Sequence, residues 1–222
     1  MQMKKIKSQI PNFVTSLNLV SGSISIILAS KQLYGYAFLA VLIGAGFDFF
    51  DGILARLLKT SSEIGKQLDS FSDLVSFGLA PSLVCFFYFE THIGIYSYFF
   101  IAIPVAVAYR LARFNIEEGE KGYFKGMPSP IVGITIVSLP YTLQSLTFEL
   151  SNMIVIPVLL ILISTCSLIM LSNIRYVKIN ISNKIQAVIL FLSLVLLFLY
   201  STKIFLPIFI FYLLSPIFYK NQ

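Results

Sequence analysis

The aspartates of this chain are gathered in one short stretch of a strongly apolar sequence. Asp48 and Asp51 form one pair, Asp69 and Asp73 form a second, and the chain has no other aspartate. A carboxylate inside a bilayer costs roughly 2.5 to 3.5 kcal/mol on insertion scales, so all four need neutralising partners. Oxygen-only ligand sets suit hard cations such as Mg2+ and Mn2+, and two such ions would balance four negative charges. The residue types therefore predict a two-metal site of the kind that handles phosphate groups.

The first pair belongs to a stripe of acidic and small residues, which consists of Asp48, Asp51, Gly52 and Ala55. Their i, i+3, i+4 and i+7 spacing places them on one face of a helix. Small residues on that face leave room for a ligand to lie against the backbone. The purely structural alternative is a network of ion pairs with neighbouring Arg and Lys residues. That alternative does not explain why Gly52 and Ala55 share the stripe.

The second pair lies at the start of the next predicted helix. Asp69 and Asp73 are four residues apart, so they share one face of that helix. The first pair lies within about three turns of the end of its own helix. We therefore expect both pairs in the same half of the membrane, where they can converge in one cavity.

The composition predicts that these residues belong to an integral membrane protein, because the 222 residues are 57% hydrophobic and only 12% charged. We expect an all-α, polytopic transmembrane helix bundle of about eight spans. The predicted spans are 13–30, 34–58, 67–89, 93–114, 131–148, 153–171, 185–200 and 204–218. Six or seven spans remain alternatives, because the last two stretches are short and only "STK" joins them.

The positions of the basic residues predict the orientation of the bundle. If the N-terminus is cytoplasmic, every Lys and Arg except Lys31 and Lys203 lies on the cytoplasmic side. We therefore expect a cell-membrane protein with both termini and the aspartates at the cytoplasmic face. The net charge of +6 is then a signal of topology and of contact with membrane lipids, and we expect no nucleic-acid partner.

Histidine and cysteine contribute little chemistry. The single histidine, His92, excludes a histidine-based zinc site, and Cys85 and Cys166 both lie in apolar runs typical of buried cysteines.

The spacing Asp48-x2-Asp51-Gly52-x2-Ala55-Arg56-x8-Gly65-x3-Asp69-x3-Asp73 resembles the signature of the CDP-alcohol phosphotransferases. The resemblance implies an integral membrane enzyme, usually a homodimer, that cleaves the pyrophosphate of a CDP-linked lipid. Such an enzyme passes the phosphoryl-bearing part to a hydroxyl group and releases CMP.

The same match assigns roles to individual residues. It implies that Asp48, Asp51 and Asp69 bind metal, and that Asp73 both supports the metal site and acts as the catalytic base. The residues expected to contact the nucleotide are Asp51, Gly52, Ala55, Arg56 and Gly65.

The stretch "IPNFVTSLNLVSG" is similar to the first helix of lipid-synthesising members of the family. Thr15 and Asn18 follow helical spacing in it and are expected to donate hydrogen bonds to the nucleotide. Polar contacts between helices are the alternative role for both residues.

A later stretch, "YRLARFN" followed by "FKGMPSP", resembles the membrane-embedded phosphatidylserine synthases. It implies CDP-diacylglycerol, or an archaeal ether-lipid equivalent, as the donor and L-serine as the acceptor. The residues expected to bind the acceptor are Arg110, Arg113, Lys125 and Ser129. An arginine fork matches the geometry of a carboxylate, although both arginines would also suit anchoring at lipid headgroups.

Two other functions stay open. The same basic residues would suit glycerol 3-phosphate or an inositol phosphate as the acceptor. A cation-coupled transporter would also use intramembrane carboxylates. We expect one membrane-embedded domain over 1–222, with a signature core at 10–135 and accessory helices at 150–218.

Overall fold

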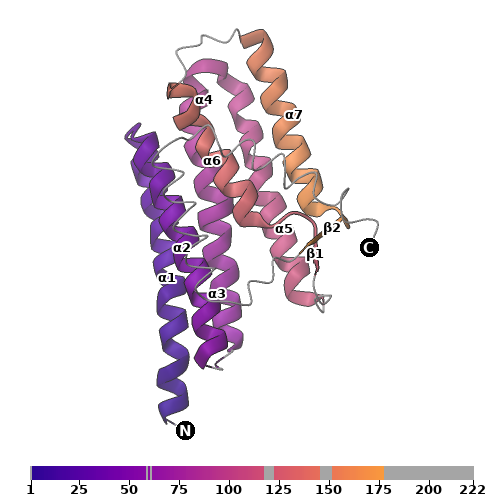
Figure 1. The fold of residues 1–222 in the computed structure, drawn as a ribbon. Coiled ribbons are helices and arrows are strands. Elements are labelled where there is room, and N and C mark those ends of the chain that lie inside the picture. Colours follow the sequence, from indigo (N-terminus) through magenta and orange to yellow (C-terminus); the bar gives the residue numbers. More distant parts are fainter. Residues whose placement is uncertain (1, 59, 61, 118–122, 146–151, 178–222) are drawn as a thin grey trace.

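The computed structural model describes residues 2–58, 60, 62–117, 123–145 and 152–177. Helices run up and down a bundle, and a short two-stranded sheet lies at one end (Figure 1). The elements are α1 (Gln2–Ser30), α2 (Tyr34–Leu58), α3 (Glu63–Asp73), the π-helix η1 (Leu74–Leu79), α4 (Ala80–Ile93), the 3-10 helix η2 (Gly94–Ile101), α5 (Ala102–Ile116), β1 (Tyr123–Lys125), α6 (Ser129–Ser145), α7 (Asn152–Leu171) and β2 (Arg175–Val177).

Four helical segments in the described residues are long and apolar enough to cross a membrane. They are Gln9–Ser30, Tyr34–Leu58, Glu63–Ile116 and Ile154–Leu171. The third segment runs out through α4 and returns through α5, with the reversal at Gly94, whose φ is 55° (Figure 1). The helical class is confirmed. The predicted spans 185–200 and 204–218 lie outside the described residues, so the count of eight stays a prediction.

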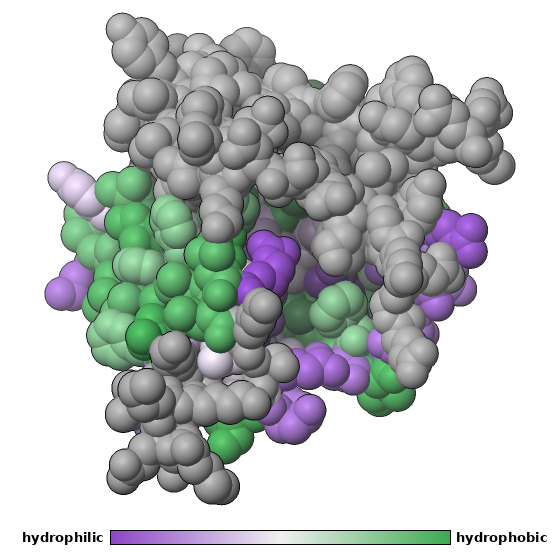
Figure 2. Space-filling model, turned by 60° about the horizontal axis from the view of Figure 1, so that its bottom comes forward, coloured by the Kyte–Doolittle hydropathy of each residue, from purple (hydrophilic) through white to green (hydrophobic). Residues whose placement is uncertain are grey.

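Apolar side chains cover much of the described surface. Figure 2 brings the lower end of Figure 1 forward and shows a hydrophobic flank beside hydrophilic side chains gathered toward the middle of that end. Large apolar side chains such as Phe13, Ile27 and Val105 are more than half exposed, which suits contact with lipid. The polar end therefore meets water, while the flanks meet the membrane.

Helix α3 continues into α4 through the π-helix η1, where the sequence predicted one regular helix over 67–89. Serine side chains attach this segment to α1, because Ser72 Oγ donates to Thr15 O at 3.0 Å and Ser76 Oγ donates to Asn18 O at 2.9 Å. Prediction from the hydrophobic period of the sequence assumes an unbroken α-helix, so it cannot find a π-helix, which is a local widening of the helix. The serine bonds set the start of this helix against α1, beside the aspartates.

The strands β1 and β2 are a second departure from the expected all-helical chain. Tyr123 pairs with Val177 and Lys125 with Arg175 in an antiparallel register. Both strands are only three residues long, too short to show an alternating pattern in the sequence. Their pairing satisfies backbone groups where the segment before α6 meets the segment after α7.

Helix α7 belongs to the main core although it lies within the predicted accessory region. Its Leu159, Ile163, Cys166 and Met170 pack in one buried cluster with residues of α4, α5 and α6. Whether the helices beyond position 150 form an accessory unit stays a prediction.

We predict that Gly133→Ala lowers the thermal unfolding midpoint of the protein in detergent. A Cβ at this position would lie 2.7 Å from Phe77 O and 2.8 Å from Phe77 Cα, so α6 and η1 would have to separate. Gly35→Ala is the matched control, because its Cβ would meet only the flexible ring of Tyr141 at 3.2 Å. An equal effect of both substitutions would contradict the close contact of α6 with η1.

Candidate active site

Three carboxyl groups from two helices meet at the polar end of the bundle. Asp48 and Asp51 extend from α2 and Asp69 extends from α3, and a carboxylate oxygen of each lies within 4.8 Å of the others. Asp51 is buried, whereas Asp48 and Asp69 are partly accessible. The structure therefore brings together three of the four aspartates in an arrangement that could hold a metal ion.

Asp73 lies one turn beyond Asp69 on α3 and is buried. Its carboxyl group lies close enough to those of Asp48 and Asp69, and to Arg110 of α5, to interact with them electrostatically. Asp73 Oδ1 is buried without a hydrogen-bond partner among the described residues. An unsatisfied buried oxygen beside three further carboxylates suits a hard divalent cation, so these residues fit Mg2+ or Mn2+.

Helix α1 also contacts the cluster. Thr15 Oγ1 donates to Asp51 Oδ2 at 2.6 Å and also lies 3.0 Å from Pro11 O. Asn18 lies one turn further along α1, fully buried beside Gly44 of α2, and its side-chain N and O have no hydrogen-bond partner among the described residues. Thr15 thus contacts the cluster directly, while the predicted contact of Asn18 with a nucleotide stays a prediction.

A cavity of about 290 Å3 opens next to the aspartates. It is lined by Pro11, Asn12, Thr15, Asp51, Gly52, Ala55, Thr60, Ser62, Gly65, Lys66 and Asp69. A Cβ added at Gly52 would meet no atom within 4 Å, so this part of α2 faces open space. Arg56 is exposed and does not line the cavity.

Five cavity residues were missed by reasoning from the sequence: Pro11, Asn12, Thr60, Ser62 and Lys66. Two of them carry a signal that could have been used. Ser62 caps the N-terminus of α3, where its Oγ accepts a hydrogen bond from Gly65 N at 3.0 Å, and serine before an acidic first turn is a common start of a helix. Asn12 belongs to the same stretch that suggested Thr15.

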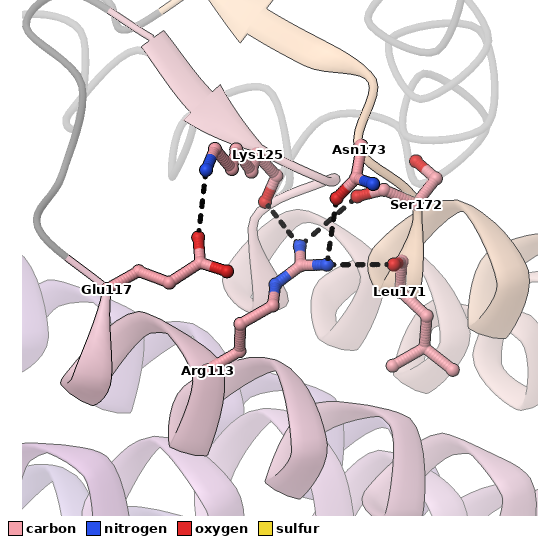
Figure 3. Close-up of polar contacts among 6 residues, drawn as sticks. All are labelled: Arg113, Glu117, Lys125, Leu171, Ser172 and Asn173. Atoms are coloured by element: carbon pink, nitrogen blue, oxygen red, sulfur yellow. Dashed lines mark hydrogen bonds and ion pairs between the residues drawn. The ribbon is translucent and has the colours of Figure 1, made fainter.

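The residues expected to bind an acceptor fall into two separate networks. Arg110 Nη1 donates to Ser129 Oγ at 3.0 Å, both residues are buried, and Arg110 interacts electrostatically with Asp73. Arg113 instead bonds to the end of α7 and to β1, and Lys125 Nζ pairs with Glu117 Oε2 at 3.0 Å (Figure 3). The structure thus connects Arg110, with Ser129 as its partner, to Asp73, and holds Arg113 and Lys125 in a different network.

Comparison with known proteins matches residues 8–161 to the family model described as CDP-alcohol phosphatidyltransferase. The chain is 35% identical to the CDP-diacylglycerol--serine O-phosphatidyltransferase of Bacillus subtilis (strain 168), over 75% of this chain and 89% of that protein. It is 35% identical to the protein of the same name from Methanocaldococcus jannaschii, over 84% and 82% of the two chains. It is 32% identical to the archaetidylserine synthase of Methanothermobacter thermautotrophicus, over 81% and 75%.

We predict that Mn2+ raises the thermal unfolding midpoint of the wild-type protein and that Asp51→Asn removes most of this effect. Binding to the folded state contributes about 2.7 kcal/mol of stability when the ion is at 100 times its Kd. The metal-free variant should unfold at a higher temperature than the metal-free wild type, because one of the clustered negative charges is gone.

The matched control is Glu117→Gln, which removes a carboxylate at the same end of the bundle but outside the cluster. It should keep the full Mn2+ effect. Equal stabilisation of wild type and Asp51→Asn by Mn2+ would contradict a metal site at these aspartates.

Proposed function

This chain belongs to the CDP-alcohol phosphatidyltransferase family, and we propose that it transfers a phosphatidyl group from CDP-diacylglycerol, or an ether-lipid equivalent, to L-serine. CMP is the second product. The observation that carries the proposal is the cluster of Asp48, Asp51 and Asp69 beside a cavity in a membrane-embedded helix bundle. The choice of serine rests on the relatives described above, which are named as serine O-phosphatidyltransferases or as an archaetidylserine synthase.

The four aspartates are the proposed metal ligands, with Asp73 completing the set formed by Asp48, Asp51 and Asp69. When bound, two Mg2+ or Mn2+ ions would neutralise the pyrophosphate and stabilise the charge that develops during phosphoryl transfer. Thr15 orients Asp51 through its 2.6 Å hydrogen bond. Because this hydroxyl is buried, it holds the carboxylate in one rotamer without competing water.

Asp73 is the proposed base. The serine hydroxyl oxygen forms a bond to the phosphorus that carries the diacylglycerol, and the bond from this phosphorus to the bridging pyrophosphate oxygen breaks. The hydroxyl proton passes to the Asp73 carboxylate, and CMP leaves with the bridging oxygen. Burial of Asp73 excludes water, which would otherwise compete with serine as the nucleophile.

The cavity beside α2 is the proposed nucleotide pocket. Gly52 and Ala55 offer a backbone surface without bulky side chains, and Gly65 packs against Asn12 at the start of α3. Arg56 is exposed in the last turn of α2 and would contact the nucleotide from outside the cavity. The acyl chains would stay in the membrane, next to the exposed apolar side chains of the bundle.

The buried pair of Arg110 and Ser129 is the proposed acceptor site. An Arg guanidinium binds a carboxylate well, and this one lies beside the proposed base, where the serine hydroxyl must be. Glycerol 3-phosphate or an inositol phosphate would use the same cation, so the acceptor requires a direct test. A cation-coupled transporter is a weaker alternative, because it would not explain the family membership.

We further propose that the cavity faces the cytoplasm and that the protein is a homodimer in the cell membrane. The cavity end carries the cations Arg56, Lys66 and Arg113, as expected for a cytoplasmic face. Water-soluble serine and cations would enter there, while the lipid substrate would arrive within the bilayer.

We predict that purified protein given CDP-diacylglycerol and Mn2+ releases CMP when L-serine is added. Asp73→Asn should lower this rate by at least about a hundredfold, because removal of a general base costs 10²–10⁴-fold. The same variant should bind CDP-diacylglycerol, which separates loss of chemistry from loss of fold. Release of CMP only with glycerol 3-phosphate or inositol phosphate would keep the family chemistry but reject serine.

We predict that Gly52→Leu abolishes binding of the nucleotide while the fold is retained. The new side chain would enter the open space of the cavity instead of a packed interface. Isothermal titration with CDP-diacylglycerol in detergent measures the loss, and the unfolding midpoint measures the fold. Unchanged binding would place the nucleotide elsewhere.

A further inference from the structure

Arg113 joins three elements of the bundle through a single guanidinium (Figure 3). Its Nη1 donates to Leu171 O at 2.9 Å and to Asn173 Oδ1 at 3.4 Å. Its Nη2 donates to Ser172 O at 3.1 Å and to Lys125 O at 3.3 Å. Each terminal nitrogen carries two N–H groups, so these four bonds use all of them. The fork that would bind an acceptor carboxylate is already occupied.

The acceptors on the α7 side are groups that a helix leaves unsatisfied. Leu171 is the last residue of α7, and Ser172 follows it, so their carbonyl groups have no partner within the helix. A cation at a helix C-terminus also interacts favourably with the helix dipole. Arg113 therefore serves α7 as a cap that is supplied by α5.

The acceptor on the other side, Lys125 O, begins the segment that leads to the proposed acceptor site. Gly126 has a φ of 73°, and a Cβ added to it would clash with Met170 O, so a side chain would not fit there. Gly126 N donates to Ile174 O at 2.8 Å, and Met127 is fully buried. The segment is thus seated on the end of α7 where Arg113 holds it.

This segment ends at Ser129, the first residue of α6 and the hydrogen-bond partner of Arg110. Arg110 lies one turn before Arg113 on α5 and interacts with Asp73. A continuous chain of contacts therefore links the end of α7, through Arg113 and the segment 125–129, to the proposed base.

We propose that Arg113 is a positioning residue that fixes the segment 125–129 on α7 and thereby holds Ser129 and Arg110 in place for the acceptor. It is not itself an acceptor ligand. This inference rests on the proposed function, and it assigns Arg113 a role different from the direct one that the sequence suggested. It makes α7 part of the acceptor site, although α7 contributes no residue to the carboxylate cluster.

The first test compares Arg113→Gln and Arg113→Lys with the wild type. Arg113→Gln should raise the KM for L-serine about tenfold or more, because several charge-assisted hydrogen bonds are lost. The KM for CDP-diacylglycerol and the Mn2+ effect on unfolding should stay unchanged. The KM of Arg113→Lys for L-serine should lie between those of the wild type and Arg113→Gln, since an ammonium group can replace only part of the guanidinium's hydrogen bonds. Equal changes in both KM values would overturn the proposal.

The second test replaces the clamp, by which we mean the hydrogen bonds that Arg113 makes between the segment 125–129 and the end of α7, by a disulfide. Lys125 and Arg175 are partners across β1 and β2, and paired Cα atoms in antiparallel strands lie about 4.5 to 5.5 Å apart, within the range a disulfide requires. Oxidation of Arg113→Gln/Lys125→Cys/Arg175→Cys should restore the low KM for serine, and reduction should reverse it. The native Cys85 and Cys166 are buried and do not compete.

The Lys125→Cys/Arg175→Cys protein with Arg113 intact gives the reference KM in each redox state. If Arg113 binds the acceptor directly, the disulfide forms but the KM stays high, and the proposal is wrong. Rescue of the KM supports it.

A third measurement separates this proposal from the proposed function. Arg113→Gln should speed amide hydrogen exchange in the peptide that contains Gly126 and Met127, whatever the acceptor is. A wild type that releases no CMP with serine would reject serine as the acceptor, yet faster exchange would still support the clamp. Unchanged exchange in Arg113→Gln would overturn the clamp even if serine is the acceptor.

Discussion

Mutual repulsion among clustered carboxylates is the constraint on which this structure depends. Asp48, Asp51 and Asp69 place their oxygens within 4.8 Å of one another in an apolar bundle, and Asp73 is buried beside them. Such an arrangement is unfavourable without cations, because both burial and like charge oppose ionisation. The rest of the fold must therefore hold these helices together against the repulsion. A site that is costly without its ligands is also one that binds cations strongly.

Close backbone packing supplies that opposing force. Gly22 and Gly44 let α1 approach η1 and α2, and a Cβ at Gly22 would lie 2.8 Å from Ser76 Cα. Ser72 and Ser76 then bond to carbonyl groups of α1, which gives the contact a fixed register. Small residues and serines are the usual means of joining helices in lipid, where burial of apolar surface contributes little to association. The aspartates thus supply the chemistry of the site, while glycines and serines at neighbouring positions hold its helices together.

The features that follow from local periodicity were predictable from the sequence. The span 34–58 agrees with α2, and Asp51, Gly52 and Ala55 of the predicted stripe line the cavity because helical spacing places them on one face. The π-helix, the strand pair and the network of Arg113 were not predictable, since each depends on contacts between segments far apart in the chain. Arg113 shows the limit most clearly. Its residue type suggested a carboxylate ligand, but only the position of α7 reveals which acceptors occupy the guanidinium.

The π-helix between Asp73 and Ala80 has a consequence for how this protein can vary. Each residue of an α-helix turns the chain by about 100°, so a local widening rotates everything beyond it relative to everything before it. The aspartates of α3 and the buried face of α4, with Val84 and Phe89, are therefore in phase only with this number of residues between them. Insertion or deletion of a single residue in the segment would turn either the charges or the core toward lipid. The number of residues between the aspartates of α3 and the buried face of α4 is therefore fixed by helix geometry.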